Sequence, residues 1–191
     1  MADDTRVPEI SLEIKPINPK EERGMQETAE EYRARMLGNT EGKNPVTLLA
    51  NAPKRLEKLL KGVSPAKLRK RPAPGKWSVS EIVAHMADAD LVVAFRIRLV
   101  LGAPGIQVQA FDQDTWVTAL HYDKRDTKKS FEQFRAVREA TVALLKSLDP
   151  EQWKLSGIHT ERGEESVETI VRMAAGHDIN HIRQVEQILK R

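Results

Sequence analysis

Two histidines near the end of the chain are spaced so that both could bind one metal ion. His177 and His181 lie four residues apart in SVETIVRMAAGHDINHIRQVEQILKR, residues 166–191. At about 100° per residue, a helix places the two imidazoles about 40° apart around its axis, one turn above the other. Neutral imidazole is a ligand of zinc and similar ions. The pair therefore indicates part of a metal site.

The segment around this pair has the periodicity of one long amphipathic helix. Its stripe contains both histidines, so we expect the imidazoles to point inward. The apolar members of the stripe are Ile170, Ala174, Val185 and Ile188. Inward histidines can instead be satisfied by hydrogen bonds within a core, as buried polar groups generally are. A third ligand would favour the metal.

A second long helix supplies a candidate for that ligand. Ser78 and Glu81 have the spacing of a capping box, and the helix that they begin is expected to end at Gly102. His85 lies near its start and shares a stripe with Ile82, Ala89 and Val92. We therefore predict that His85 faces inward and completes a site with His177 and His181.

Three aspartates are candidates for supporting this site. Asp88 is one turn from His85, and Asp112 and Asp114 lie in the connection that follows the helix. Each could orient a ligand imidazole or contact substrate, although a helix cap or a solvated acid is the alternative for each. The other histidines, His121 and His159, fall outside periodic segments, and we expect both to be exposed.

No general base is evident beside the histidines. Asp178 follows His177 directly but projects about 100° away from it on a helix. The sequence HDINH also lacks the glutamate that follows the first histidine in zincin proteases. This excludes a protease of that class.

The remaining helices suggest how these residues are brought together. A short helix is expected at 25–37, a longer one after Asn44 with a kink or restart at Pro53, and a third long one over 126–148. The inner face predicted for the last consists of Phe134, Val137, Thr141, Leu144 and Leu148. The long helices with their connections predict an all-α, antiparallel four-helix bundle. We expect an extended N-terminal arm at 1–24 and one bundle domain at 25–191.

Composition limits the function classes. The 191 residues carry a net charge of +3 and contain no cysteine, which excludes disulfides and thiolate ligands. The N-terminus has no secretory pattern and no apolar run is long enough to span a membrane, so a cytoplasmic location is expected. Residues 54–76 carry nine Lys or Arg against one acid. Because stacking aromatics are missing there, nucleic acid is not the expected partner.

Several segments together resemble a known family. PAPGKWSVSEIVAHMADAD, FDQDTW and AGHDINHIRQVEQIL, in this order, are similar to the DinB/YfiT-like superfamily of metalloenzymes, over roughly residues 30–190. The resemblance implies an antiparallel four-helix bundle with a long crossover and a homodimer. It also implies one divalent ion, zinc, nickel or iron, held by three histidines that correspond to His85, His177 and His181.

Two enzyme classes remain open for such a site. Three imidazoles leave a coordination position for water, as in a hydrolase, or for a thiol, as in a low-molecular-weight-thiol S-transferase. Either would act on a small-molecule substrate. The alternative is a non-catalytic bundle that binds an acidic partner through the basic segment 54–76.

Overall fold

The computed structural model describes residues 27–190. The predicted arm at 1–24 and the first two residues of the predicted first helix lie outside this range. Seven α-helices are described: α1 (Ala29–Gly38), α2 (Pro45–Leu60), α3 (Pro65–Arg69), α4 (Val79–Gly102), α5 (Gln113–Ala119), α6 (Thr127–Lys146) and α7 (Val167–Leu189). Three short strands lie between helices: β1 (Gln107–Val108) between α4 and α5, and β2 (Ser156–His159) and β3 (Gly163–Ser166) between α6 and α7.

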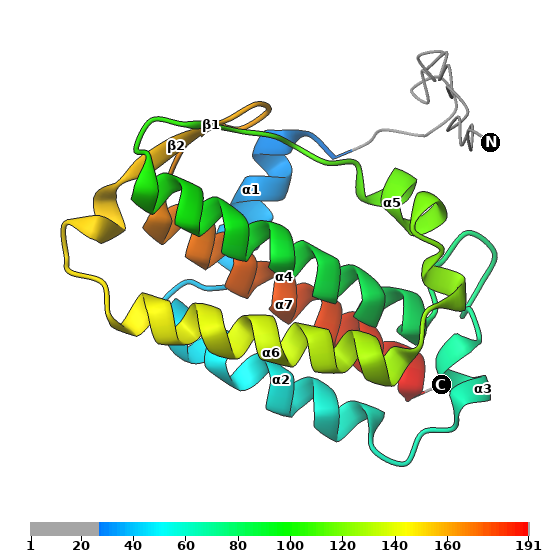
Figure 1. Ribbon diagram of the computed structural model, residues 1–191. Helices are drawn as coiled ribbons and strands as arrows, with labels where there is room; N and C mark the ends of the chain where they lie inside the picture. Colours follow the sequence, from blue (N-terminus) through cyan, green and yellow to red (C-terminus); the bar gives the residue numbers. More distant parts are fainter. Residues whose placement is uncertain (1–26, 191) are drawn as a thin grey trace, which may run out of the picture.

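The predicted four-helix bundle is confirmed, and α2, α4, α6 and α7 form it (Figure 1). Figure 1 shows α4 antiparallel to α7 and α2 antiparallel to α6. The connection at 103–126 runs back along the bundle, so α6 starts at the same end as α4 and runs parallel to it. This connection, which contains β1 and α5, is the long crossover.

Helix starts agree with the capping signals of the sequence. Ser78 accepts a hydrogen bond from the Glu81 backbone at 3.3 Å, and the Glu81 carboxylate accepts one from the Ser78 backbone at 2.7 Å. Asn44 caps α2 in a similar way. The helix does not restart at Pro53, because α2 is continuous across that residue. The short helix α3 was not predicted.

The interior of the bundle has a polar layer between two apolar clusters. Ile82, Phe134 and Ile182 belong to one cluster, while Ile97 and Val171 belong to the other. Between them each of the helices α4, α6 and α7 contributes charged or imidazole side chains. The buried face of α6 differs from the predicted inner face, since Val137, Leu144 and Leu148 are only half-buried. The residues buried there are Ser130, Phe131, Phe134, Arg138, Thr141, Val142 and Leu145.

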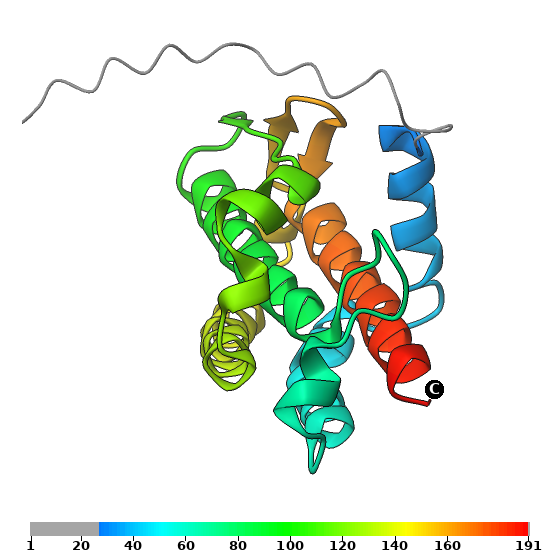
Figure 2. The ribbon, with the colours of Figure 1, turned by 90° about the vertical axis from the view of Figure 1, so that its right-hand side faces the viewer.

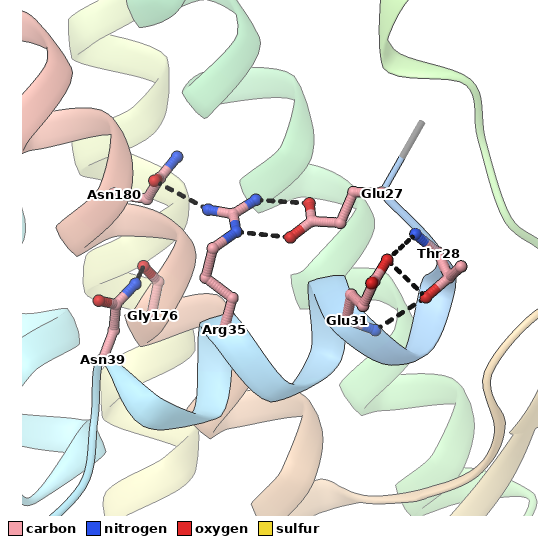
Figure 3. A network of polar contacts seen from close by, with 7 residues as sticks. All are labelled: Glu27, Thr28, Glu31, Arg35, Asn39, Gly176 and Asn180. Atoms are coloured by element: carbon pink, nitrogen blue, oxygen red, sulfur yellow. Dashed lines mark hydrogen bonds and ion pairs between the residues drawn. The ribbon is translucent and has the colours of Figure 1, made fainter. Parts of the chain in front are cut away.

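Helix α1 lies across α7 at a point where the backbones approach closely (Figures 2 and 3). A Cβ added to Gly176 would lie 2.0 Å from the carbonyl oxygen of Met36, so only glycine fits there. Asn39 donates to the Gly176 carbonyl at 3.2 Å, and Arg35 donates to Asn180 at 3.0 Å (Figure 3). Helix α1 is therefore fixed beside the turn of α7 that carries His177.

The three strands form a small sheet at the end of the bundle where α4 ends and α7 begins (Figure 1). Strand β1 pairs in parallel with β2, with Val108 opposite His159. Strand β2 pairs antiparallel with β3, with His159 opposite Gly163. The sequence did not predict this sheet, because each strand is very short and β1 lies about fifty residues before its partner β2.

None of the helices in residues 27–190 combines the length and the apolar character that a bilayer crossing requires.

Candidate metal centre

The histidines predicted to form a site converge in the structure. His85 on α4 and His177 and His181 on α7 each offer one nitrogen, and these nitrogens lie within 4.8 Å of one another. Nε2 of His85 is 2.9 Å from Nε2 of His177. The capping box fixes the start of α4 two turns before His85, so local structure sets the place of this histidine on its helix. The packing of α4 beside α7 then brings it to His177 and His181.

Neighbouring side chains orient the imidazoles. Nδ1 of His181 lies 3.0 Å from Oε1 of Gln184, an acceptor, so this nitrogen carries the proton and Nε2 is left with a free lone pair. The Trp77 ring lies 5.1 Å from the His85 ring and nearly parallel to that of His181. Trp77 therefore covers one side of the histidine group.

The histidines are neutral at physiological pH. Burial, followed by the proximity of His181, lowers the pKa of His85 to about 3. Burial also lowers the pKa of His181 to about 4. The pKa of His177 is well below its ordinary value, through burial and the neighbouring histidines. Neutral imidazoles present the lone pairs that a metal ion requires.

The arrangement fits a divalent cation of the zinc type. Nitrogens bound at about 2.1 Å with tetrahedral angles are about 3.4 Å apart, and the 2.9 Å between the two Nε2 atoms is close to this value. Nδ1 of His85 is buried without a hydrogen-bond partner among the described residues. The 2.9 Å contact is also short enough for a hydrogen bond between the two rings, but the unpartnered Nδ1 of His85 shows that hydrogen bonds do not satisfy the whole group, as core histidines would require.

A cavity of about 670 Å³ opens from the histidines. His85 and His177 line one part of it. Its size lies within the range of about 300–1,000 Å³ that is usual for small-molecule sites. The cavity gives a substrate access to the side of the histidines that Trp77 does not cover.

The aspartates predicted to support the site have other contacts. Asp88 accepts hydrogen bonds from Arg125 at 2.6 Å and Gln133 at 3.0 Å, so these two residues, and not an imidazole, are its hydrogen-bond partners. Asp112 accepts from the backbone N–H of Asp114 and Thr115 as the N-cap of α5. Asp112 and Asp114 both line the cavity, where substrate contact remains a prediction.

A buried ion network lies directly beside the histidines. Arg138 on α6 donates to Asp90 on α4 at 2.7 Å and to Asp178 on α7. All three side chains are buried and line the cavity. Burial raises the pKa of Asp90 to about 6, against the opposing effect of Arg138. With two carboxylates to one guanidinium, the network favours a cation nearby.

His159 does not lie where the sequence placed it. We expected an exposed loop histidine, but it ends β2 and is only 1% exposed. Strand pairing with β1 and β3 carries it inward, and it lines the same cavity as His85. His121 is exposed in its connection, as predicted.

Sequence reasoning missed the buried charged residues of the cavity, Asp90, Arg96 and Arg138. One signal for them was available: Arg138 follows Phe134 by four residues and precedes Thr141 by three, which places it on the inner face of α6. Arg96 likewise follows His85 by eleven residues, or about three helical turns. Charged residues at inward positions mark a functional or structural ion site.

Comparison with known proteins identifies related sequences. Residues 48–185 match the model of the DinB superfamily. A protein of Oceanobacillus iheyensis named "Putative metal-dependent hydrolase OB0413" is 29% identical over 133 residues, which cover 69% of this chain and 76% of that protein. The "Putative metal-dependent hydrolase YfiT" of Bacillus subtilis is 22% identical over 163 residues, covering 84% and 92% of the two chains.

One solved structure has the same fold. It is YfiT from Bacillus subtilis, described as "a probable metal-dependent hydrolase with an unusual four-helix bundle topology". The alignment has a TM-score of 0.72 at 19% sequence identity and covers 92% of this chain and 95% of that one. At this identity the similarity establishes the bundle topology alone.

Proposed function

The chain belongs to the DinB superfamily, and on this premise we propose that it is a metal-dependent hydrolase of a small molecule, with one divalent ion held by His85, His177 and His181. The observation that carries the proposal is the convergence of three neutral imidazole nitrogens within 4.8 Å at a cavity. The names of the relatives agree with a hydrolase.

The chain's own groups have separate tasks in this reaction. When bound, a divalent ion supplies Lewis acidity and lowers the pKa of a water at its open position towards about 7. Gln184 holds His181 in the tautomer that presents Nε2. Trp77 excludes bulk water from one side of the imidazoles. Asp90 lines the cavity with its Oδ2 unpartnered among the described residues, so it is our candidate for accepting a proton there.

Metal analysis tests the proposal directly. Protein purified without a histidine tag, stripped and then reloaded, should bind one equivalent of zinc, nickel or iron, and elemental analysis would identify the ion that it carries from the cell. His181→Ala should lose that ion and keep its helical circular dichroism. His121→Asn is the matched control, because this histidine is exposed and asparagine tolerates its left-handed backbone, φ 49°. Failure of the wild-type protein to take up a stoichiometric ion would refute the proposal.

The thiol-transferase alternative uses the same site and is separated by spectroscopy. Cobalt substituted at the histidines would show a sulfur-to-metal charge-transfer band on addition of a small thiol if the thiol occupies the open position. If none of a series of thiols produces this band, the transferase is excluded and the hydrolase is the function that is left.

The non-catalytic alternative depends on the basic segment 54–76, whose Lys and Arg side chains are all exposed. One of them, Arg71, pairs with the buried Glu81 and so has a structural role. If the segment binds an acidic polymer, log affinity should fall linearly with log salt. Absence of binding at low salt would exclude this function.

A further inference from the structure

The cavity has a second polar end, formed by Arg96 and by residues of the sheet. Arg96 is buried, 8% exposed, and lines the cavity. Its guanidinium donates to the Gln109 carbonyl oxygen and lies 5.8 Å from the centre of the Phe111 ring. Among residues 27–190, no carboxylate forms an ion pair with it. A buried cation whose only partners are neutral can gain from binding an anion.

His159 adds an unused donor at the same end. Its Nδ1 accepts a hydrogen bond from the backbone N–H of Glu161 at 3.1 Å, so the proton of the neutral ring is on Nε2. Nε2 is buried and has no hydrogen-bond partner in the described part of the chain. Burial, together with the nearby charges of Arg162 and Arg96, lowers the pKa of His159 to about 4, which keeps the ring neutral.

The acids nearest to Arg96 and His159 are paired elsewhere or exposed. Arg162 forms a bidentate ion pair with Glu165, at 2.7 and 3.0 Å, and Glu165 is 1% exposed. The pair is therefore neutral as a unit. Glu161 also lines the cavity but is exposed, where water screens its charge. Arg96 therefore has no ion-pair partner of its own among residues 27–190, although Glu165 and Glu161 attract it and Asp112 and Asp114 also line the cavity.

The spacing along α4 relates this end to the histidines. Eleven residues separate His85 from Arg96, which is three turns plus about 20°, with a rise of about 16 Å. Both residues consequently lie on one face of the helix. The lining between these two ends is mixed: Ala89 and Val93 from α4 and Met173 from α7 are apolar, while the ion network of Asp90, Arg138 and Asp178 adds polar groups.

From this arrangement we propose that Arg96 and His159 bind a carboxylate of the substrate, and that the substrate is an elongated acid that spans the distance from Arg96 to the histidines. This deepens the proposed function and rests on it, since the reacting group is placed at the metal. It assigns the two ends of the cavity different tasks: the histidine end holds the bond to be hydrolysed, and the Arg96 end sets position and specificity.

The test uses probes that bind at both ends. Hydroxamates bind metal ions, so monohydroxamates of straight-chain dicarboxylic acids, from about four to about ten carbons, can place a carboxylate at varying distances from the metal. Each is compared by calorimetry with the alkyl hydroxamate of the same length, on zinc-loaded full-length protein. At the best length we expect the carboxylate probe to bind at least about tenfold tighter.

Variants locate the effect. In Arg96→Met the preference for the carboxylate probe should disappear, while the alkyl hydroxamate keeps its wild-type affinity. The matched control is Arg98→Met, because Arg98 is on the same helix but exposed, and it should retain the preference. Arg96→Lys should retain part of it. A preference of equal size in wild type and folded Arg96→Met would overturn the assignment.

The wild-type comparison decides the matter even if Arg96→Met does not fold. Equal affinity for carboxylate and alkyl probes at every length would overturn the proposal. If neither probe binds, suberate titrated into metal-free protein tests Arg96 by itself: binding that Arg96→Lys weakens supports the carboxylate site, and no binding overturns it. Metal stoichiometry, measured separately, shows whether the proposed hydrolase fails independently.

Discussion

The buried guanidinium of Arg138 in α6 donates hydrogen bonds to Asp178 of α7, the residue directly after His177. It donates to Asp90 of α4 as well. One side chain thus connects α6 to both helices that carry the histidines, within the polar layer between the two apolar clusters.

Removing this guanidinium should be costly. In Arg138→Met two buried carboxylates lose their partner, and we expect the free energy of unfolding to fall by about 3–5 kcal/mol. Urea denaturation followed by circular dichroism measures this. Arg135→Met, an exposed position on the same helix, should change it by less than about 0.5 kcal/mol. Equal stability of the two variants would show that the ion network contributes little.

Gln184 should affect metal binding without being a ligand. Gln184→Ala removes the acceptor 3.0 Å from Nδ1 of His181, so the ring is free to rotate and to change tautomer. Loss of such a partner lowers metal affinity by about 10–100-fold. Competition with a chelator measures the affinity, and Gln187→Ala, exposed on the same helix, is the control. Unchanged zinc affinity in Gln184→Ala would mean that packing alone orients His181.

Two glycines provide a test of how α1 is fixed to α7. Gly176→Ala would place a Cβ 2.0 Å from the Met36 carbonyl oxygen, a backbone atom that cannot move independently of α1. We expect destabilisation of about 1–3 kcal/mol or more, with increased proteolysis of α1. Gly38→Ala has no atom within 4 Å of its added Cβ and should be neutral or stabilising by up to about 1 kcal/mol. Wild-type stability in Gly176→Ala would contradict the close approach.

The bundle and the histidine group were predictable because they depend on local periodicity. His85, His177 and His181 each share a stripe with apolar neighbours, and caps such as Ser78 mark the helix starts. The position of His159 was not predictable in this way. It is buried because β2 pairs with β1, a strand of two residues about fifty positions earlier, and such pairing leaves no periodic signal.

The ion network was missed for a related reason. Asp90, Arg138 and Asp178 each appear as an ordinary charged residue, since charged residues are usually exposed. Only the packing of α4, α6 and α7 against each other shows that Arg138 pairs with both carboxylates. For Arg96, whose hydrogen-bond partner within residues 27–190 is the neutral Gln109 carbonyl, the same reasoning leads to a ligand instead of a protein partner.

The buried His159 should make stability depend on pH. Its pKa in the folded chain is about 4, lowered by burial and then by Arg162 and Arg96, against about 6.5 when unfolded. Between these values the unfolded chain binds more protons, so the stability contribution is complete above about pH 6.5 and is lost as pH falls towards about 4. His159→Gln should remove from the free energy of unfolding a slope of up to about 1.4 kcal/mol per pH unit in this window.

Urea denaturation of metal-free protein from about pH 7 to about pH 4 measures this slope in the variant and in wild type. The other buried histidines contribute equally to both proteins. Identical pH profiles for wild type and His159→Gln would show that His159 accepts a proton without unfolding.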